Sequence, residues 1–343
     1  MSNYIFYIFI FCSWSPNCIC QSYKDSNGTT GGIKTITGVL NKLLTGYDRR
    51  VRPNYEGGPV VVTVGFTLLS IDSINVIDMD FSLDMFLRQE WTDERLDHGT
   101  NDTMFLSNHV MDRVWLPDSY FVNSKDAKFH TVTTANRMIM LGPKGKVKYN
   151  ARVTVKAYCS MDLKEFPMDT QFCSLVFESY GYIDKHITFL WEPNMKPVPE
   201  SLKELPQYKL NGLKLSYTYT IYIVGNWSGL NATFEFERTY SYFIYHAYAP
   251  SAIIVIISWI GFVLPRDKPP ARITLGVTSV LTVVTILTML SNHVAKVNYV
   301  KRIDQYLIGC FLFVFGSLLE YAVVLFLGTV TFQYGAWNYE EGY

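Results

Sequence analysis

The sequence predicts an extracellular antiparallel β-sandwich with an N-terminal helix, followed by transmembrane α-helices, of which three are visible and a fourth is missing. Of the 343 residues, 49% are hydrophobic and 17% are charged, whereas soluble domains average roughly 25% charged residues. The mean hydropathy of +0.09 is too low for a chain that lies in a membrane throughout. Residues 21–238 mix polar and apolar side chains, and three long apolar runs follow Arg238, so a soluble part precedes a membrane part.

Charge and motifs exclude several classes of function. The 30 Lys and Arg residues balance the 30 Asp and Glu residues, so the chain has no basic footprint for nucleic acid. There is no G-x-S-x-G, H-E-x-x-H, P-loop, G-x-G-x-x-G or C-x-x-C motif, and no two of the six histidines are spaced i, i+4. We therefore expect no enzyme, no metal site and no cofactor.

The N-terminus has the pattern of a signal peptide. Residues 1–20 hold no charged side chain and open with an apolar run, and cleavage is expected before Gln21. The alternative, a membrane anchor, is disfavoured because the run at 4–11 is too short to span a bilayer. We expect an extracellular domain at 21–238, opening with a helix at 37–45.

Strand patterns fill this domain. Residues 81–87, 152–158 and 214–223 alternate apolar and polar side chains and are rich in β-branched and aromatic types. Turn signals such as Gly-Pro-Lys-Gly at 142–145 separate the runs. Many short strands of this kind indicate a sandwich.

Three apolar runs follow within a membrane region at 239–328. Helices are expected at about 240–264, 273–292 and 303–327, each near the length that crosses about 30 Å of hydrocarbon. The last residues, 329–343, form no further apolar run and are expected to be a truncated tail.

Cysteine usage points to one disulfide. Three of the six cysteines leave with the signal peptide, and Cys310 lies in the third membrane helix as a buried thiol. Cys159 and Cys173 remain, and a bond between them would close a loop of 13 intervening residues and stabilise the fold by roughly 3 kcal/mol. We expect glycans at the sequons of Asn27, Asn101 and Asn231.

The second apolar helix carries a polar face. Thr274, Thr278, Leu281, Thr285 and Thr288 recur at steps of 4, 3, 4 and 3, which places them on one side of an α-helix. Small hydroxyls interrupted by one leucine suit a water-filled pore with a hydrophobic gate. The alternative is ordinary helix packing, in which threonine bonds back to its own helix.

The charges at the start of this helix favour anions. No acidic residue stands between Lys268 and Asn292, while Lys268 and Arg272 flank Pro270 and Ala271 at the helix start. Symmetric copies would form a ring of arginines beside the positive end of the helix dipole. The alternative is positive-inside anchoring, and both can hold together.

Several motifs resemble one family. The loop Cys159 to Cys173, with Phe-Pro-Met-Asp at 166–169, resembles the signature of the Cys-loop, or pentameric ligand-gated, receptors. The run PPARITLGVTSVLTVVT at 269–285 resembles the pore helix of their anion-selective branch. Four stretches resemble GABA-type subunits of the β, rho or RDL kind: GYDRRVRP at 46–53, WLPDSYF at 115–121, ESYGY at 178–182 and ELPQ at 204–207.

The resemblance implies a homo- or hetero-pentamer in the plasma membrane, at synapses, with agonist sites between subunits and chloride passing a central pore. The principal face of each site would use Tyr120, Glu178, Ser179, Tyr180, Tyr222 and Trp227, and the complementary face Phe86, Arg88 and Asn150. The pore would be lined from Pro270, Ala271, Arg272, Thr274, Thr278, Leu281 and Thr285. Gating would be coupled through Asp72, Asp169, Arg238, Lys296 and Lys301.

These residue types suit a small zwitterionic neurotransmitter. Tyrosine and tryptophan rings bind an ammonium group, a glutamate adds a counter-charge, and an arginine binds a carboxylate bidentately. GABA fits this set best.

Three departures from the GABA pattern leave other agonists open. Val224 replaces a hydroxyl residue, Trp227 a tyrosine and Met140 a basic residue. Glycine, an amine, histamine or protons are alternative agonists. A glycan on Asn226, also a sequon, would crowd the binding loop and is not expected. Two further alternatives are a truncated, non-conducting subunit that modulates full-length partners, and a tethered adhesion domain.

Overall fold

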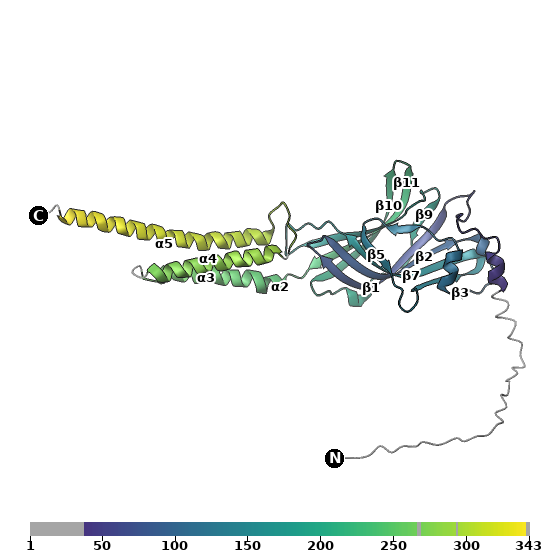
Figure 1. Ribbon diagram of the computed structural model, residues 1–343, viewed down its shortest axis with the longest axis horizontal. Coiled ribbons are helices and arrows are strands. Elements are labelled where there is room, and N and C mark those ends of the chain that lie inside the picture. The colour runs from purple at the N-terminus through teal and green to yellow at the C-terminus, as the bar shows by residue number, and fades with distance from the viewer. Residues whose placement is uncertain (1–37, 266–268, 293, 341–343) are drawn as a thin grey trace, which may run out of the picture.

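A computed structural model describes residues 38–265, 269–292 and 294–340. A β-domain occupies one end of the elongated molecule and a bundle of helices the other (Figure 1). The expected signal peptide and Asn27 lie outside the described residues. A helix at residues 38–44 opens the described chain, as the sequence predicts.

The first layer of the β-domain is a seven-stranded sheet. Its order is β3-β6-β7-β2-β1-β9, with β5 also paired to β7. The long strands β1, β2 and β7 run antiparallel, and β9 joins β1 in parallel. The bounds are β1 Val60–Asn75, β2 Asp80–Thr92, β3 Met104–Leu106, β5 Ser124–Phe129, β6 Arg137–Leu141, β7 Lys146–Tyr158 and β9 Ile187–Trp191.

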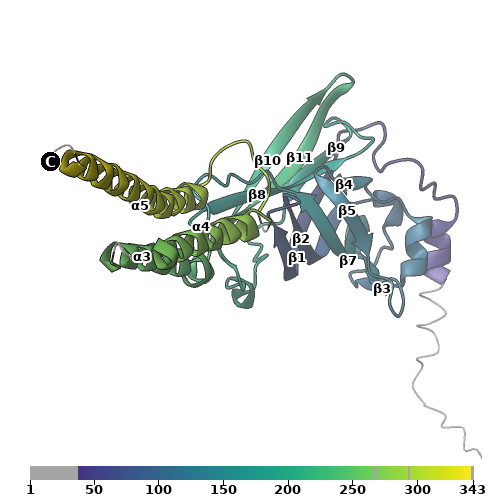
Figure 2. The same ribbon diagram turned by 60° about the vertical axis from the view of Figure 1, so that its left-hand side comes forward.

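The second layer is a four-stranded antiparallel sheet of order β10-β11-β8-β4. The β10–β11 hairpin projects beyond the body of the sandwich (Figure 2). The bounds are β4 Ser119–Phe121, β8 Thr170–Ser179, β10 Tyr208–Tyr222 and β11 Gly225–Arg238. Short 3-10 turns connect the strands: η1 Glu94–Leu96, η2 Asn108–Arg113, η3 Pro143–Gly145 and η4 Glu200–Leu202.

Alternating side chains make the core between the two sheets. In β11, Leu230, Ala232, Phe234 and Phe236 are buried to 1% exposure or less, while the intervening residues face outward. The Phe234 ring lies 5.9 Å from that of Phe81 on the opposite sheet. Burying these large apolar side chains is the main stabilising term of the domain. The predicted sandwich is confirmed; the predicted strands 81–87 and 152–158 lie within β2 and β7, and 214–223 coincides with the end of β10 but runs one residue past it.

One predicted turn depends on glycine. Gly145 ends η3 with φ of 72°, a conformation that side chains disfavour. A Cβ there would lie 2.1 Å from the carbonyl oxygen of Asp93. The turn leading into β7 therefore needs glycine for both backbone angle and space.

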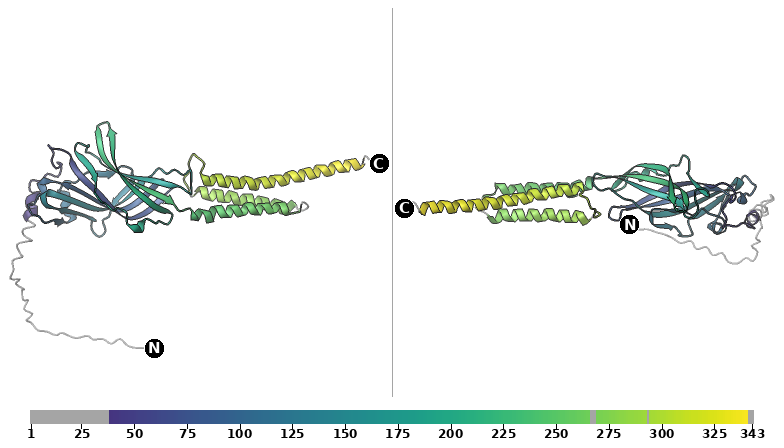
Figure 3. Two further views of the ribbon diagram at one scale, coloured as in Figure 1. Left: turned by 180° about the vertical axis from the view of Figure 1, so that it is seen from behind. Right: turned by 90° about the horizontal axis from the view of Figure 1, so that it is seen from above.

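Three helices in the described chain are long and apolar enough to cross a membrane, at Ser241–Val263, Pro269–Asn292 and Arg302–Val330. The first is built from α2 Ser241–Phe243, the π-helical turn η5 Ile244–Tyr248 and α3 Ala249–Val263. The others are α4 Pro269–Asn292 and α5 Arg302–Glu340. Three helices were predicted, but α4 begins at Pro269 instead of residue 273. Proline is tolerated there because the first N–H groups of a helix have no partner within the helix. Helix α5 continues through residues 329–340, which were expected to be a tail, and extends beyond the other two helices (Figure 3).

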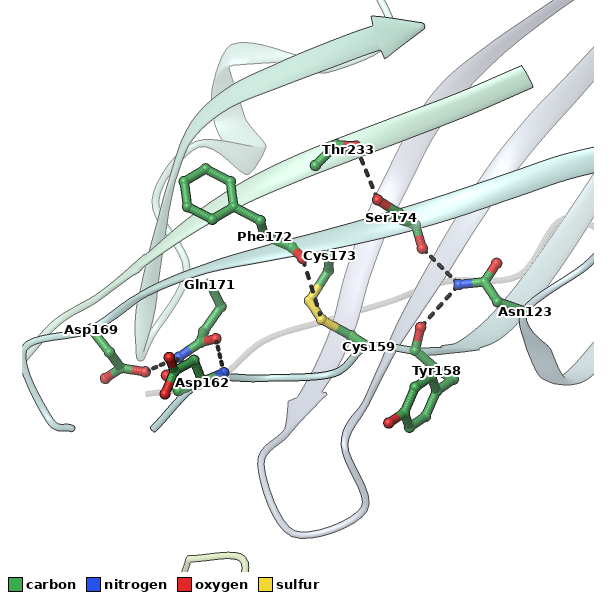
Figure 4. Close-up of a disulfide and its surroundings, with 10 residues drawn as sticks. All are labelled: Asn123, Tyr158, Cys159, Asp162, Asp169, Gln171, Phe172, Cys173, Ser174 and Thr233. Carbon is green, nitrogen blue, oxygen red and sulfur yellow. Dashed lines mark hydrogen bonds between the residues drawn. A yellow bond between two sulfur atoms is a disulfide. The ribbon is translucent and has the colours of Figure 1, made fainter. Parts of the chain in front are cut away.

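The predicted disulfide between Cys159 and Cys173 is present (Figure 4). We name residues 159–173 the disulfide loop. Beside it, the Asn123 side-chain amide donates to the carbonyls of Tyr158 at 2.9 Å and Ser174 at 2.7 Å, so it bridges the end of β7, just before Cys159, and β8, which carries Cys173. The loop is thereby anchored at its base and reaches from the sandwich toward the helices.

Candidate functional site

Aromatic side chains gather on the outer face of the four-stranded sheet. Tyr120 of β4 and Glu178 of β8 are direct cross-strand partners. The Tyr180 ring, 78% exposed, stands edge-on to that of Tyr120 at 5.5 Å between centroids. Tyr222 ends β10 beside them and Trp227 lies in β11. We name Tyr120, Glu178, Tyr180, Tyr222 and Trp227 the aromatic cluster.

The carboxylate of Glu178 lies at the base of this cluster, only 1% exposed. The hydroxyl of Thr220 donates to its Oε1, and the hydroxyl of Tyr222 lies 3.5 Å from its Oε2. Gly229, directly across from Glu178, makes room for it, because a Cβ there would lie 2.7 Å from the glutamate Cγ. A buried carboxylate under tyrosine rings can attract a cation.

Trp227 backs the cluster rather than opening into it. Its side chain is 9% exposed, and the Tyr222 ring stands perpendicular to it at 5.1 Å. Burial, followed by the nearby Tyr222 and Glu178, raises the pKa of Tyr120. Tyr120 therefore presents a neutral hydroxyl at physiological pH.

Ser179 has a structural role next to the cluster. Its hydroxyl donates to Asp118 and accepts from the Tyr182 N–H at 3.0 Å. The other Asp118 oxygen accepts from the Gly181 N–H at 2.6 Å. The buried Ser179 thus holds the loop that presents Tyr180, and it does not itself face the cluster.

The residues predicted for the complementary face lie on the outer face of the seven-stranded sheet. Arg88 of β2 is paired across the strands with Asn150 of β7, and Phe86 is 38% exposed one step along the same face. The side-chain oxygen of Asn150 is buried and has no hydrogen-bond partner within the described chain. A shallow hollow lies here, lined by Phe86, Ala135, Asn136, Arg137, Met138, Asn150 and Arg152.

A lysine stands where the sequence showed a missing basic residue. Met140 of β6 pairs directly with Lys148 of β7, two residues from Asn150 on the same face. Lys148 lies 3.0 Å from Glu90, which also binds Lys146. The two lysines leave one positive charge uncompensated beside Arg88.

Within one chain the aromatic cluster does not meet the residues around Arg88, Phe86 and Asn150. Glu178 is on the outward side of one sheet and Arg88 on the outward side of the other, with the core between them. Two clusters on opposite faces can face each other only when a second chain packs alongside.

The predicted coupling residues separate into two groups. Asp169 and Arg238 form a buried ion pair, and Lys301 lies 3.0 Å from Asp304. Asp72 and Lys296 are exposed, and Asp72 accepts from the Ser70 hydroxyl at 2.5 Å.

The disulfide loop rests on the link between α4 and α5. The Leu163 N–H donates to the Tyr299 hydroxyl at 2.8 Å, and Arg302 pairs with Glu165 at 2.9 Å. The Phe166 ring lies 4.9 Å from that of Phe243 in α2. The disulfide loop therefore contacts the start of two membrane helices.

The threonine face of α4 points away from the other two helices. Thr274, Thr278, Leu281, Thr285 and Thr288 are all exposed in the single chain, with Leu281 at 65%. The opposite side, with Gly276, Ser279 and Val283, is buried. Three hydroxyls on this face donate to the carbonyl four residues back at 2.8 Å, those of Thr278, Thr285 and Thr288. Such bonds are expected of threonine in ordinary helix packing, but here the side chains lie on the exposed face.

Arg272 does not share the open face of the threonines in the single chain. It lies on the packed side of α4, in line with Gly276, because 200° of helical rotation separate it from Thr274. Its guanidinium donates to the carbonyls of Phe262 and Leu264 at the end of α3 and stacks on Tyr321 at 5.1 Å. Pro270 and Ala271 are exposed instead.

The sequons sit in different surroundings. Asn101 is exposed in a connecting segment, and Asn226 is exposed near the tip of the β10–β11 hairpin. Asn231 is half-buried in β11, and its side-chain oxygen is covered.

Five residues of these clusters were not predicted. The sequence did not single them out, because threonine, glycine, lysine and acidic residues are common in and beside strands without any role in binding. Only cross-strand register brings them to the site: Asp118, Lys148, Glu192, Thr220 and Gly229.

Comparison with known proteins identifies the family of the β-domain and of the helices. Residues 36–240 match the neurotransmitter-gated ion-channel ligand binding domain, and residues 247–331 match the neurotransmitter-gated ion-channel transmembrane region. The chain is 42% identical over 313 residues to the gamma-aminobutyric acid receptor subunit beta-4 of Gallus gallus, which covers 90% of this chain and 64% of that relative. The chain belongs to the neurotransmitter-gated ion-channel family, a family of membrane channels and not of enzymes.

Proposed function

We propose that this chain is a subunit of a pentameric chloride channel that opens when GABA binds between neighbouring subunits. The single observation that carries the proposal is the pair of complementary clusters on opposite faces of one sandwich. A closed ring of subunits brings the aromatic cluster of one against the Arg88 face of the next. The name of the chicken relative supports GABA as the agonist.

The chemistry of the two faces fits a zwitterion. The ammonium group would lie among Tyr120, Tyr180 and Tyr222, above the buried Glu178 carboxylate. Cation–π contacts of this kind contribute roughly 0.5–2 kcal/mol each. The carboxylate would reach Arg88, which lies directly across the strands from Asn150.

The helix α4 fits an anion pore. Its open face carries threonine hydroxyls and one leucine, and no acidic residue lies in its first turn. Leu281 would form the closed constriction, where a hydrophobic ring excludes water. Arg272 donates hydrogen bonds to the end of α3, and its positive charge near the start of α4 would still favour anions at that end of the pore.

The test is a voltage clamp on cells that express the full chain, alone and with the chicken relative. GABA is applied first, then glycine, histamine, a biogenic amine and acid, while external chloride is varied. A GABA-evoked current whose reversal potential follows chloride is the expected result.

Binding of labelled GABA to intact cells is measured in parallel. Surface protein that neither binds GABA nor responds to it overturns the agonist assignment. Binding without current in either combination overturns the channel assignment, and reversal that follows sodium overturns anion selectivity.

A further inference from the structure

Every edge of the Arg88 guanidinium is already occupied. Its Nη1 donates to the Thr67 hydroxyl at 2.7 Å, and its Nη2 lies 3.3 Å from the carbonyl oxygen of Phe66. The remaining edge, Nε and Nη2, faces one carboxylate oxygen of Glu192 at 3.3 and 3.1 Å. That edge is the one that grips a carboxylate side-on. No edge is left free for the carboxylate of a ligand.

The approach of Glu192 is built into the sheet. Glu192 follows β9, and its N–H donates to the Val64 carbonyl at 2.8 Å, which continues the β1–β9 pairing by one residue. Strand β1 separates β9 from β2, and Gly65 is the β1 residue directly across from Arg88. The glutamate side chain crosses over this glycine, since a Cβ on Gly65 would lie 2.0 Å from its Oε2.

The pair is open to exchange. The Arg88 and Glu192 side chains are 35% and 42% exposed, so both reach water at the face where a neighbouring subunit would dock. Exposed ion pairs contribute little, so an incoming carboxylate can replace one at small cost. The pair therefore holds Arg88 in place without locking it.

We propose that Glu192 is an internal competitor that occupies the carboxylate site on Arg88 and is displaced when a carboxylate-bearing agonist binds. The inference rests on the proposed function, because it assigns Arg88 to the ligand. It makes Glu192 a specificity residue: it weakens zwitterions and leaves amines without a carboxylate unaffected.

The test compares Glu192→Gln with Glu90→Gln in cells that express the full chain. Glu90 is the matched control, since it carries the same charge on the same face but pairs with Lys146 and Lys148 instead of Arg88. Displacement of labelled GABA should show about threefold to fivefold tighter binding in Glu192→Gln and a smaller change in Glu90→Gln, whereas the binding of butylamine, which lacks the carboxylate, should be unchanged in Glu192→Gln. Gly65→Ala, which pushes Glu192 aside without removing its charge, should act in the same direction.

Weaker or unchanged GABA binding in Glu192→Gln overturns the proposal, because Glu192 would then position Arg88 or do nothing. A second readout needs no ligand: phenylglyoxal labelling of Arg88, followed by mass spectrometry. Labelling should be faster in Glu192→Gln than in the unmodified chain or Glu90→Gln. Equal labelling rates overturn the internal competitor even if GABA never binds, which separates this failure from that of the proposed function.

Discussion

The carboxylate of Asp169 lies 2.7 Å from the guanidinium Nε of Arg238, and both side chains are only 3% exposed. A second contact of 3.0 Å makes the pair bidentate. The guanidinium also lies 4.6 Å from the rings of Phe166 and Tyr208. Arg238 is the last residue of the sandwich before the first membrane helix, so this pair ties the disulfide loop to the point where the chain enters the membrane.

Arg238→Gln should strongly destabilise this junction. Removing one partner of a buried ion pair leaves the other charge buried, at a cost of about 3–5 kcal/mol. The melting temperature of the detergent-solubilised protein and its surface expression should both fall. Arg50→Gln, which breaks an ion pair with 85% and 42% exposed side chains, is the control and should change neither. If both variants lowered the melting temperature equally, burial of the ion pair would not determine the loss of stability.

Gly229→Ala should weaken agonist binding without unfolding the sandwich. The added methyl would lie 2.5 Å from Thr218 Oγ1 and 2.7 Å from Glu178 Cγ, so the carboxylate must move. We expect at least a tenfold loss in GABA affinity, corresponding to roughly 1.4 kcal/mol. Gly212→Ala in β10, whose nearest atom is 3.2 Å away on Glu235, should bind normally. Normal binding by Gly229→Ala would remove Glu178 from the site.

Lys148→Met should reduce the potency of carboxylate agonists. Lys148 stands directly across from Met140 and two residues from Asn150, so it supplies positive potential beside Arg88. A loss of about threefold to tenfold is expected from removing one partly screened charge. Lys146→Met removes the other lysine on Glu90, farther from Arg88 along β7, and should have a smaller effect. The measurement is a GABA concentration–response curve for each variant. A larger loss of potency in Lys146→Met than in Lys148→Met would contradict this role of Lys148.

Leu281→Thr should raise agonist sensitivity and produce leak current. Replacing an exposed leucine on the threonine face with a hydroxyl residue weakens the hydrophobic barrier and shifts the closed population toward open. Ile273→Thr, an exposed position off that face, should leave the dose–response curve in place. If Leu281→Thr does not move the curve, the gate lies elsewhere.

Tyr299→Phe should impair gating more than binding. The Tyr299 hydroxyl accepts from the Leu163 N–H at 2.8 Å and so bonds the disulfide loop directly to the α4–α5 link. We expect a lower maximal current with unchanged displacement of labelled GABA. Arg302→Gln breaks the exposed pair with Glu165 at the same contact and should have a smaller effect, since both side chains are about 60% exposed. A change in GABA affinity would place Tyr299 in binding instead.

Much of the architecture could be predicted from patterns along the chain. Alternation within 152–158 marks a strand, and runs without charges mark the membrane helices, because burial depends on a local repeat. The spacing of Thr274, Thr278 and Thr285 also placed them on one face, which is open in the structure. The helix ends were less accurate, because apolar runs do not mark where hydrogen bonding stops: α5 continues to Glu340.

The sequence by itself determined the sandwich, the three apolar helices, the disulfide and the family, because each depends on residue type and spacing. The tertiary structure alone decided which side chains share a site. Arg272 has the expected identity, yet helix packing turns it toward Phe262 and away from the threonines. Glu192 and Arg88 are 104 residues apart in the chain. They meet only because β9 and β2 both pair with β1, where Gly65 leaves room for the glutamate side chain. Contacts of that kind are set by register and packing, which no local pattern encodes.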